Sequence, residues 1–146
     1  MGVKELIFFI MNNEIKNYLG IDWGEAKIGL AIADEETRMA FCFDTLRKEK
    51  NPVKKIIEII KEENIKAVVI GIPSHINRIE TVYEGEKLGE KIKKETGVEI
   101  CYQDEMFTTK MAQINLIEKG VKRTGRFDDQ EAARIILQEW LDNQIR

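Results

Sequence analysis

Carboxylates occur at three places in this chain where the surrounding sequence makes them unusual. Asp22 lies inside an apolar strand, Asp104 and Glu105 end a later strand, and Asp128 and Asp129 stand at the start of the last predicted helix. Brought together, three carboxylates would form an oxygen-only site suited to Mg²⁺ or Mn²⁺, which are hard cations. Two such ions about 3.5–4 Å apart can activate a water and stabilise the leaving oxygen in phosphodiester cleavage.

Each acidic position also has a simpler explanation. Asp128 before a helix would be a good N-cap, favoured by the helix dipole, and Asp104 with Glu105 would suit a solvated strand end. Asp22 is harder to explain by structure alone, because a buried ion costs several kcal/mol unless something pairs it. The joint occurrence of the three places therefore carries the metal-site hypothesis.

The hydrophobic pattern predicts the elements that must position these acids. Apolar or alternating runs predict strands at residues 18–24, 28–34, 39–43, 67–73 and 98–105. Helical spacing of apolar residues predicts helices at about 52–64, 82–94, 108–120 and 129–143. The first two strands form a hairpin around residues 24–27, and the uninterrupted run at 67–73 is typical of a strand buried on both faces.

This order of elements predicts an α/β fold. Three antiparallel strands come first and parallel strands follow, so we expect a five-stranded mixed sheet with helices on both faces. In such sheets the functional crevice lies at the carboxyl ends of the parallel strands. Asp22, the turn at residues 71–73, and Asp104 with Glu105 are all expected near that edge.

Composition describes an ordinary water-soluble domain. The chain has 146 residues with a net charge of −3, which suits one domain and excludes a surface that is basic overall. Cys42 and Cys101 lack CxxC spacing, so we expect no zinc site, two small core residues and a reduced, cytoplasmic compartment. The apolar run at residues 6–11 is too short to span a membrane.

The domain boundary is predicted near residue 17. Residues 1–17 are expected to be an N-terminal extension that is partly flexible, and residues 18–146 a single domain. Both Met1 and Met11 are candidate starts of translation.

Four motifs resemble the YqgF/RuvX family, whose members are described as Holliday-junction resolvases and as pre-16S rRNA nucleases within the RNase H-like superfamily. The resemblance extends over residues 18–140. The motifs are LGIDWG (19–24) with KIG (27–29), VIGIP (69–73), DEMFTT (104–109) and DQEAARIILQ (129–138).

The resemblance implies an RNase H-like fold and a metal-dependent nuclease. By motif position, the catalytic and metal-binding residues would be Asp22, Glu105 and Asp129, holding Mg²⁺ or Mn²⁺, with Asp22 bridging the ions. The implied substrates are the 5′ end of precursor 16S rRNA or DNA that resembles a Holliday junction. The residues themselves leave open whether Asp104 or Glu105 enters the site, and whether the protein is a monomer or a homodimer.

Basic residues surround the acidic motifs. Lys119, Lys122, Arg123 and Arg126 precede Asp129, with no acid among residues 119–127, and a basic rim suits a phosphate backbone approaching a metal site. A solvated loop is the simpler explanation. We also expect Lys27 to bind nucleic acid, although the family usually has arginine there, and lysine lacks its bidentate fork.

Three further side chains near the predicted edge have open roles. Met106 stands where the family usually has arginine, which puts a phosphate contact in doubt. His75, the only histidine, is expected to be a surface residue more often than a proton donor or phosphate contact. Trp23 would either stack on a base or pack in the core.

Two other functions compete with the nuclease. The turn after Asp22 resembles the phosphate loop of actin-like kinases and ATPases, but this chain would supply one lobe where those proteins close two. A module that binds RNA or DNA without catalysis is the other alternative, and Met106 keeps it open.

Overall fold

A computed structural model of the chain describes residues 2–12, 15–24, 26–72, 79–104 and 125–144. Five strands form one sheet in the order β3-β2-β1-β4-β5. The strands are β1 (Asn17–Trp23), β2 (Lys27–Asp34), β3 (Phe41–Arg47), β4 (Ile65–Ile72) and β5 (Glu99–Asp104). The helices are α1 (Val3–Asn12), the 3₁₀ helix η1 (Lys48–Lys50), α2 (Pro52–Glu62), α3 (Ile79–Thr96) and α5 (Gly125–Asp142).

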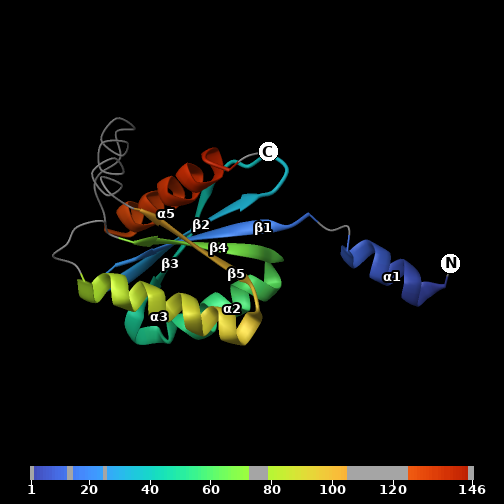
Figure 1. The fold of residues 1–146 in the computed structure, drawn as a ribbon, viewed down its shortest axis with the longest axis horizontal. Helices are drawn as coiled ribbons and strands as arrows, with labels where there is room; N and C mark the ends of the chain where they lie inside the picture. The colour runs from blue at the N-terminus through green and yellow to red at the C-terminus, as the bar shows by residue number, and fades with distance from the viewer. Residues whose placement is uncertain (1, 13–14, 25, 73–78, 105–124, 145–146) are drawn as a thin grey trace.

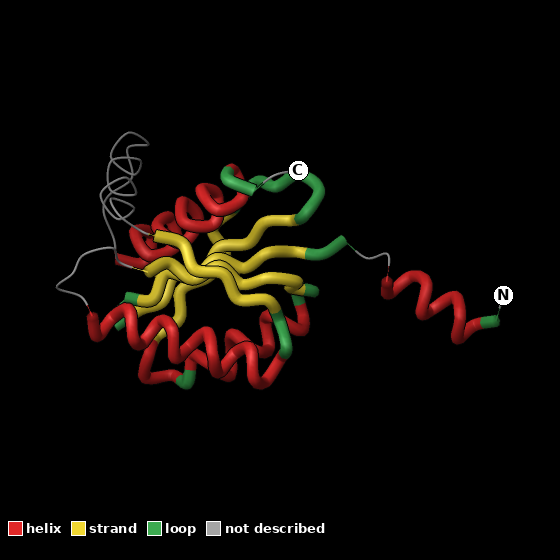
Figure 2. Tube along the Cα trace, viewed as in Figure 1, coloured by secondary structure: helices red, strands yellow, loops and turns green. Residues whose placement is uncertain are grey.

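The sheet is mixed and is covered on both faces, as predicted. β2 pairs antiparallel with β1 and β3, whereas β4 pairs parallel with β1 and β5. Helix α5 covers one face, and α2 and α3 lie together on the other (Figures 1 and 2). The α/β architecture with antiparallel strands first and parallel strands afterwards is therefore confirmed.

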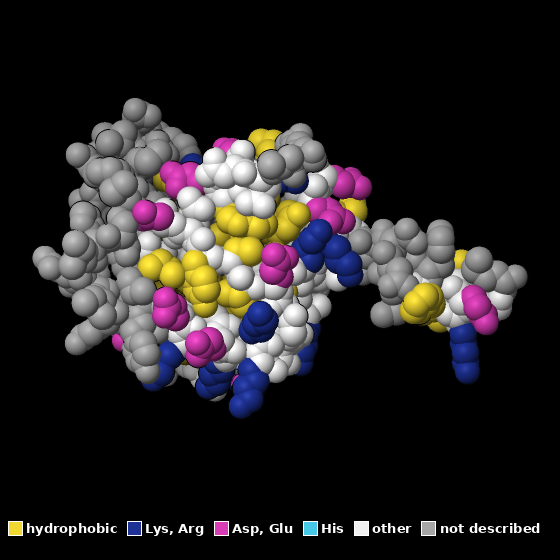
Figure 3. All heavy atoms as spheres, in the orientation of Figure 1, with side chains coloured by type: hydrophobic (Ala, Val, Ile, Leu, Met, Phe, Trp, Pro, Cys, Tyr) yellow, Lys and Arg dark blue, Asp and Glu magenta, His cyan; other side chains and the backbone are white. Residues whose placement is uncertain are grey.

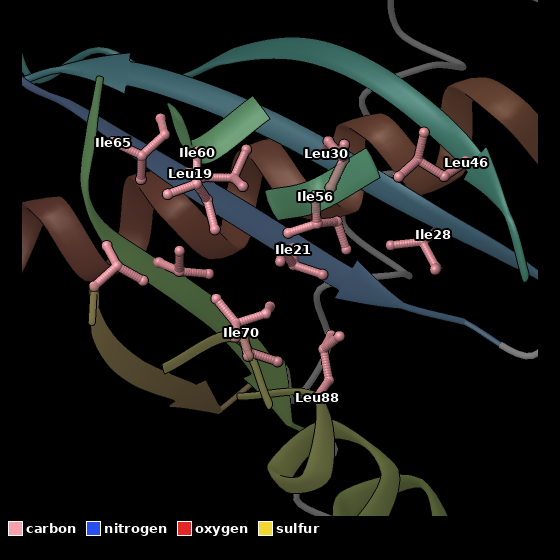
Figure 4. Packing of buried hydrophobic residues seen from close by; sticks show 13 residues of the cluster. Leu19, Ile21, Ile28, Leu30, Leu46, Ile56, Ile60, Ile65, Ile70 and Leu88 are labelled. Atoms are coloured by element: carbon pink, nitrogen blue, oxygen red, sulfur yellow. The ribbon is translucent and has the colours of Figure 1, made fainter. Parts of the chain in front are cut away.

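The larger hydrophobic cluster fills the space between the sheet and helices α2 and α3. Leu19 and Ile21 of β1 pack there with Ile70 of β4, and Ile56 of α2 closes over them (Figure 4). All four side chains are fully buried. Burying each contributes about 1.5–3 kcal/mol relative to leaving it in water, so alternate residues of β1 are committed to this face.

The opposite face carries small residues, which let α5 approach the sheet closely. A methyl group added at Gly20 would lie 2.7 Å from Leu137 Cβ and 3.0 Å from the Ala133 carbonyl oxygen. Ala31 and Ala33 of β2 are buried in the same cluster under the helix. At Gly20 the helix therefore packs directly against the backbone of β1.

Local signals account for the turns. The Gly24 N–H donates to the Lys27 carbonyl (3.1 Å) and closes the hairpin between β1 and β2. Pro52 occupies the first turn of α2, where its missing N–H costs nothing, after Asn51 in the left-handed region (φ 51°).

Two predicted boundaries were wrong. Helix α5 begins at Gly125 rather than near Asp129, so Asp128 lies within the helix and is not its N-cap. Strand β3 spans Phe41–Arg47 rather than 39–43, because its register is set by pairing with β2 and by the burial of Leu46, not by the exposed Met39 and Phe41. The helix predicted at 108–120 lies outside the described residues.

The prediction that both cysteines are core residues was wrong for Cys42 and held in part for Cys101. Cys42 is exposed on the edge strand, where its thiol donates to Glu131 Oε2 (3.5 Å), and Cys101 is half-buried. Burial, helped by the nearby Glu99 charge, raises the pKa of the Cys101 thiol to about 11. Cys101 is therefore protonated at neutral pH and is not poised to act as a nucleophile.

Helix α1 stands apart from the rest of the molecule (Figure 1). Val3, Leu6, Ile7 and Phe8 expose much of their surface. Within the part of the chain that the structure describes, no helix combines the length and apolar character needed to cross a bilayer.

Candidate active site

The carboxyl ends of the three parallel strands meet at one edge of the sheet. β1 ends just after Asp22, and in the parallel register Asp22 lies beside Gly71 of β4, which lies beside Gln103 of β5. On its other side Asp22 pairs with Gly29 of β2. The residues Gly29, Asp22, Gly71 and Gln103 thus form one row across the sheet, which we call the Asp22 row.

The Asp22 row faces helix α5. Leu19 and Ile21 point into the core on the other face, so by alternation Gly20 and Asp22 point toward α5, as the contact of Gly20 with that helix confirms. Both strand neighbours of Asp22 are glycines. No side chain from an adjacent strand therefore covers the half-buried carboxylate within its row.

Helix α5 brings Asp129 to the same place. The backbone of Asp129 lies so close to Gly29 that a methyl group there would sit 1.9 Å from the Asp129 carbonyl oxygen. Oδ1 of Asp129 would lie 3.9 Å from a methyl on Gly24, in the turn just after Asp22. Asp129 and Gly29, which are a hundred positions apart in the sequence, therefore lie together at the Asp22 row.

Strand alternation separates Asp104 from this face. Cys101 packs in the cluster under α5, and Gln103 hydrogen-bonds to Glu139 of that helix. Tyr102, in contrast, contacts Gly89 and the Glu86 carbonyl of α3. Asp104 follows the same alternation as Tyr102 and is exposed. Glu105 itself lies outside the described residues.

The donors at this edge fit a hard cation. Asp22 and Asp129 supply carboxylate oxygens, and the glycines of the Asp22 row leave the first of them accessible. Carboxylate oxygens are what Mg²⁺ and Mn²⁺ prefer. Across the residues placed by the structure, no three His, Cys, Asp or Glu side chains form a metal-sized group. Of the three predicted acids, Asp22 and Asp129 are among the described residues and Glu105 is not.

Trp23, next to Asp22, is fixed on the opposite face of the sheet. Its indole N–H donates to Glu84 Oε2 of α3 (3.0 Å), and the Lys48 ammonium lies 4.6 Å from the ring centroid. The hydrogen bond from Trp23, followed by one from Lys48, lowers the pKa of Glu84. Of the two roles left open for Trp23, packing is the one the structure shows: its ring borders the core.

The predicted nucleic-acid contacts are only partly described. Lys27 opens β2 at the same edge, and Arg126 lies in the first turn of α5. The other residues predicted to act here lie outside the described part of the chain: Lys119, Lys122, Arg123, His75 and Met106.

Sequence reasoning missed a basic surface beside β3. A hollow of about 630 Å³ is lined by Lys27, Arg47, Lys50 and Lys55, together with Asp44, Thr45 and Leu46. The signal was present in RKEKNPVKK (residues 47–55), where five of nine residues are basic.

A family described as RuvX: Holliday junction resolvase matches residues 16–143. The chain belongs to the RuvX family. A relative from Dictyoglomus turgidum, named "Putative pre-16S rRNA nuclease", is 37% identical over 131 residues, which cover 86% of this chain and 93% of the relative. A relative of the same name from Fusobacterium nucleatum is 38% identical over 136 residues, covering 88% of this chain and 98% of the relative.

Solved structures show the fold of this RuvX chain independently. RuvC of T. thermophilus in complex with a Holliday junction substrate matches with a TM-score of 0.58 at 18% identity, covering 87% of this chain and 94% of RuvC. The Fowlpox virus resolvase with Holliday junction DNA matches with a TM-score of 0.61 at 10% identity, covering 91% and 100%. The expected RNase H-like architecture is thereby confirmed.

Proposed function

We propose that this RuvX chain is a Mg²⁺- or Mn²⁺-dependent nuclease that hydrolyses phosphodiester bonds in structured nucleic acid. The observation that carries the proposal is the convergence of Asp22 and Asp129 at the carboxyl edge, with glycines on both sides of Asp22. A phosphodiester is an anion, so carboxylates alone would repel it. Hard cations bound between the acids would reverse that repulsion and polarise the phosphoryl oxygens.

We assign the third ligand to Glu105. Gln103 shares the face of Asp22, and the next residue with the same strand parity is Glu105, whereas Asp104 alternates to the other face. The family resemblance selects the same residue. Asp22, Glu105 and Asp129 would then be the catalytic residues, and Lys27 with the basic residues before Asp129 would hold the substrate backbone.

The names of the relatives and of the family favour two substrates. The relatives point to precursor 16S rRNA, and the family description points to four-way DNA junctions. We also propose a cytoplasmic location, where the protein would meet either substrate. Cutting both strands of a junction symmetrically would require a homodimer, whereas trimming an RNA end requires a monomer only.

The decisive experiment presents both substrates side by side. Labelled precursor 16S rRNA and a labelled four-way DNA junction are incubated with Mn²⁺ and either wild type or Asp22→Asn. We expect Asp22→Asn to fold normally and to lose most of its cleavage rate. Removing a residue that only supports a metal ligand typically costs roughly 10–100-fold in activity, and the loss here should be larger. Undiminished cleavage by a clean preparation of this variant would refute the proposal.

A matched pair of variants tests the third ligand. Glu105→Gln is expected to lose cleavage and to weaken Mn²⁺ binding in calorimetry, because it removes a charged ligand without changing the side-chain length. Asp104→Asn, which makes the same chemical change one residue away, is expected to retain both. If wild type binds RNA without metal and never turns it over, the chain is a binding module.

A further inference from the structure

We propose that the open edge of β3 forms a second phosphate-binding surface, which holds the nucleic-acid backbone away from the bond being cut. This inference rests on the proposed function and extends it. The surface, which we call the β3 groove, is the hollow of about 630 Å³ beside β3. It is lined by Lys27, Asp44, Thr45, Leu46, Arg47, Lys50 and Lys55.

The charge of the β3 groove is opposite to that of the chain. Four of its lining residues are cations and one, Asp44, is an acid, in a protein whose net charge is −3. Asp44 is engaged locally, since its Oδ1 accepts the Thr45 N–H (2.8 Å). A local concentration of lysine and arginine on an acidic protein is the electrostatic footprint expected for a polyanion.

Among the residues that the structure describes, no strong ion pair holds the cations of the groove. Arg47 contacts Glu49 (3.4 Å), but both side chains are more than half exposed, and such surface pairs contribute about 0–1 kcal/mol. Lys48 shows the contrast, because Glu84 and the Trp23 ring hold it outside the groove. A phosphate could therefore displace Glu49 from Arg47 at little cost.

The β3 groove is continuous with the candidate active site. Lys27 is the register partner of Arg47, and Gly29, which contacts Asp129, is the partner of Thr45. Thr45 Oγ1 also accepts a hydrogen bond from the Gln130 side chain (3.0 Å), one residue after Asp129. A nucleic-acid strand that passes Asp129 would thus reach Lys27 and Arg47 next. It would then reach Lys50 of η1 and Lys55 of α2.

The lining favours recognition of the backbone over recognition of bases. Among the described residues that line the groove none is aromatic, so stacking platforms are missing from it, and lysine ammonium groups carry no sequence information when they contact phosphates. Lys and Arg side chains also gather along the lower rim of the body, where α2 and α3 lie (Figure 3). The ligand is therefore a phosphodiester backbone, in RNA or in DNA.

The test measures how binding depends on salt in an Asp22→Asn background, where cleavage does not interfere. Lys50→Gln with Lys55→Gln removes two groove charges and keeps most of each side-chain stem. The matched control, Lys54→Gln with Lys61→Gln, removes two exposed charges of α2 that do not line the groove. Labelled precursor 16S rRNA and a four-way DNA junction form separate arms, each titrated from about 50 to 200 mM salt.

We expect the groove pair to bind more weakly and to lower the slope of log K against log salt by about 2, roughly 1 for each lysine. The control pair should keep the slope of the Asp22→Asn parent. A response in one arm only assigns the groove to that nucleic acid. Arg47→Gln serves as a second variant, with an expected slope change of about 1, and thermal unfolding verifies that each variant is folded.

Equal slopes for the groove and control pairs in both arms would overturn the inference. This failure is distinct from failure of the proposed function. If the wild type cleaves but the groove and control variants show equal salt slopes, the active site is present and the groove does not bind the substrate. If the wild type never cleaves but the groove variants show the lower salt slope, the groove binds nucleic acid and the proposed nuclease activity is absent.

Discussion

Asp22 is a strand residue whose two neighbours in the sheet carry no side chains. Glycine within a strand is normally a weakness, because it costs backbone entropy and adds nothing to packing. Here Gly29 has a specific use, since the Asp129 backbone occupies the space where its side chain would be. The identity of one glycine therefore sets how closely two carboxylates approach.

Gly29→Ala tests this dependence. The added methyl would lie 1.9 Å from the Asp129 carbonyl oxygen, so the helix backbone at Asp129 must shift. Overpacking of this kind costs about 1–3 kcal/mol of stability, and a displacement of about 1 Å at a reacting group can cost roughly 100-fold in rate. We expect both losses, measured by chemical unfolding and by cleavage of labelled precursor 16S rRNA.

Gly85→Ala in α3 is the matched control. Among described residues its methyl would meet only Ile70 Cγ2, at 3.8 Å, which is an ordinary contact. An alanine inside a helix gains roughly 0.5–1 kcal/mol over glycine. A Gly29→Ala protein as stable and as active as Gly85→Ala would contradict the account of the site given above.

At the scale of elements, α5 links the core to the site. Near the beginning of the helix, Asp129 lies over Gly29 at the carboxyl edge of the sheet. Further along, Ala133 and Leu137 pack on Gly20, and Trp140 lies against Tyr18 (ring centroids 5.4 Å apart). The helix therefore runs antiparallel to β1, and the same packing that buries its apolar face places Asp129.

Glu139 is the side chain of α5 that opposes this packing. Burial, with smaller contributions from the Asp104 and Asp142 charges, raises its pKa above the ordinary 4.5, although a hydrogen bond from Gln103 acts against the shift. A carboxylate whose pKa is raised by folding binds its proton more tightly when folded. Its ionisation therefore destabilises the fold, fully at neutral pH and not at all well below 4.5.

Glu139→Gln is accordingly expected to raise the melting temperature at about pH 7 and to leave it nearly unchanged at about pH 4. Glu139 keeps much of its solvent exposure, so the gain is modest. Thermal scans of wild type and variant at the two pH values measure it. An equal change at both pH values would mean that packing, rather than ionisation, is responsible.

Much of the element order could be read from the sequence, and the exceptions have physical causes. The runs at 67–73 and 98–105 were predictable because they are buried or alternate regularly. β3 was misplaced because an edge strand takes its register from its neighbour, which its own apolar residues do not reveal. The sequence suggested Asp22 and Asp129 as candidate ligands by their chemistry, and this assignment stays a prediction. The packing of the Asp129 backbone on Gly29 could not be read from the sequence, because it depends on how α5 lies on the sheet.

For the whole molecule, the sheet and its covering helices begin at about Lys16. The Lys16 ammonium donates to Asn64 Oδ1 (3.0 Å), its backbone N–H donates to Glu35 (3.3 Å), and the Asn17 amide donates to the Glu63 carbonyl (2.7 Å). The RuvX match begins at the same residue. Helix α1 precedes this boundary and stands apart (Figure 1). That residues 1–17 are an extension of the domain stays a prediction.

We therefore expect a chain shortened to begin at Ile15 to fold as the full chain does. Its melting temperature should agree with that of the full chain within about 2–4 °C, which corresponds to roughly 1 kcal/mol for a domain of this size. Differential scanning calorimetry of both chains makes the comparison. A larger drop would show that residues 1–14 contribute to the stability of the domain.

The close seating of α5 on the sheet also has a consequence for heat inactivation. Because the main chain at Asp129 packs directly on Gly29 of β2, we expect the helix to stay on the carboxyl edge of the sheet as long as the interior is intact. Cleavage activity should consequently survive heating up to the cooperative melting transition. The loss of activity and the loss of folded structure should then follow the same curve against temperature.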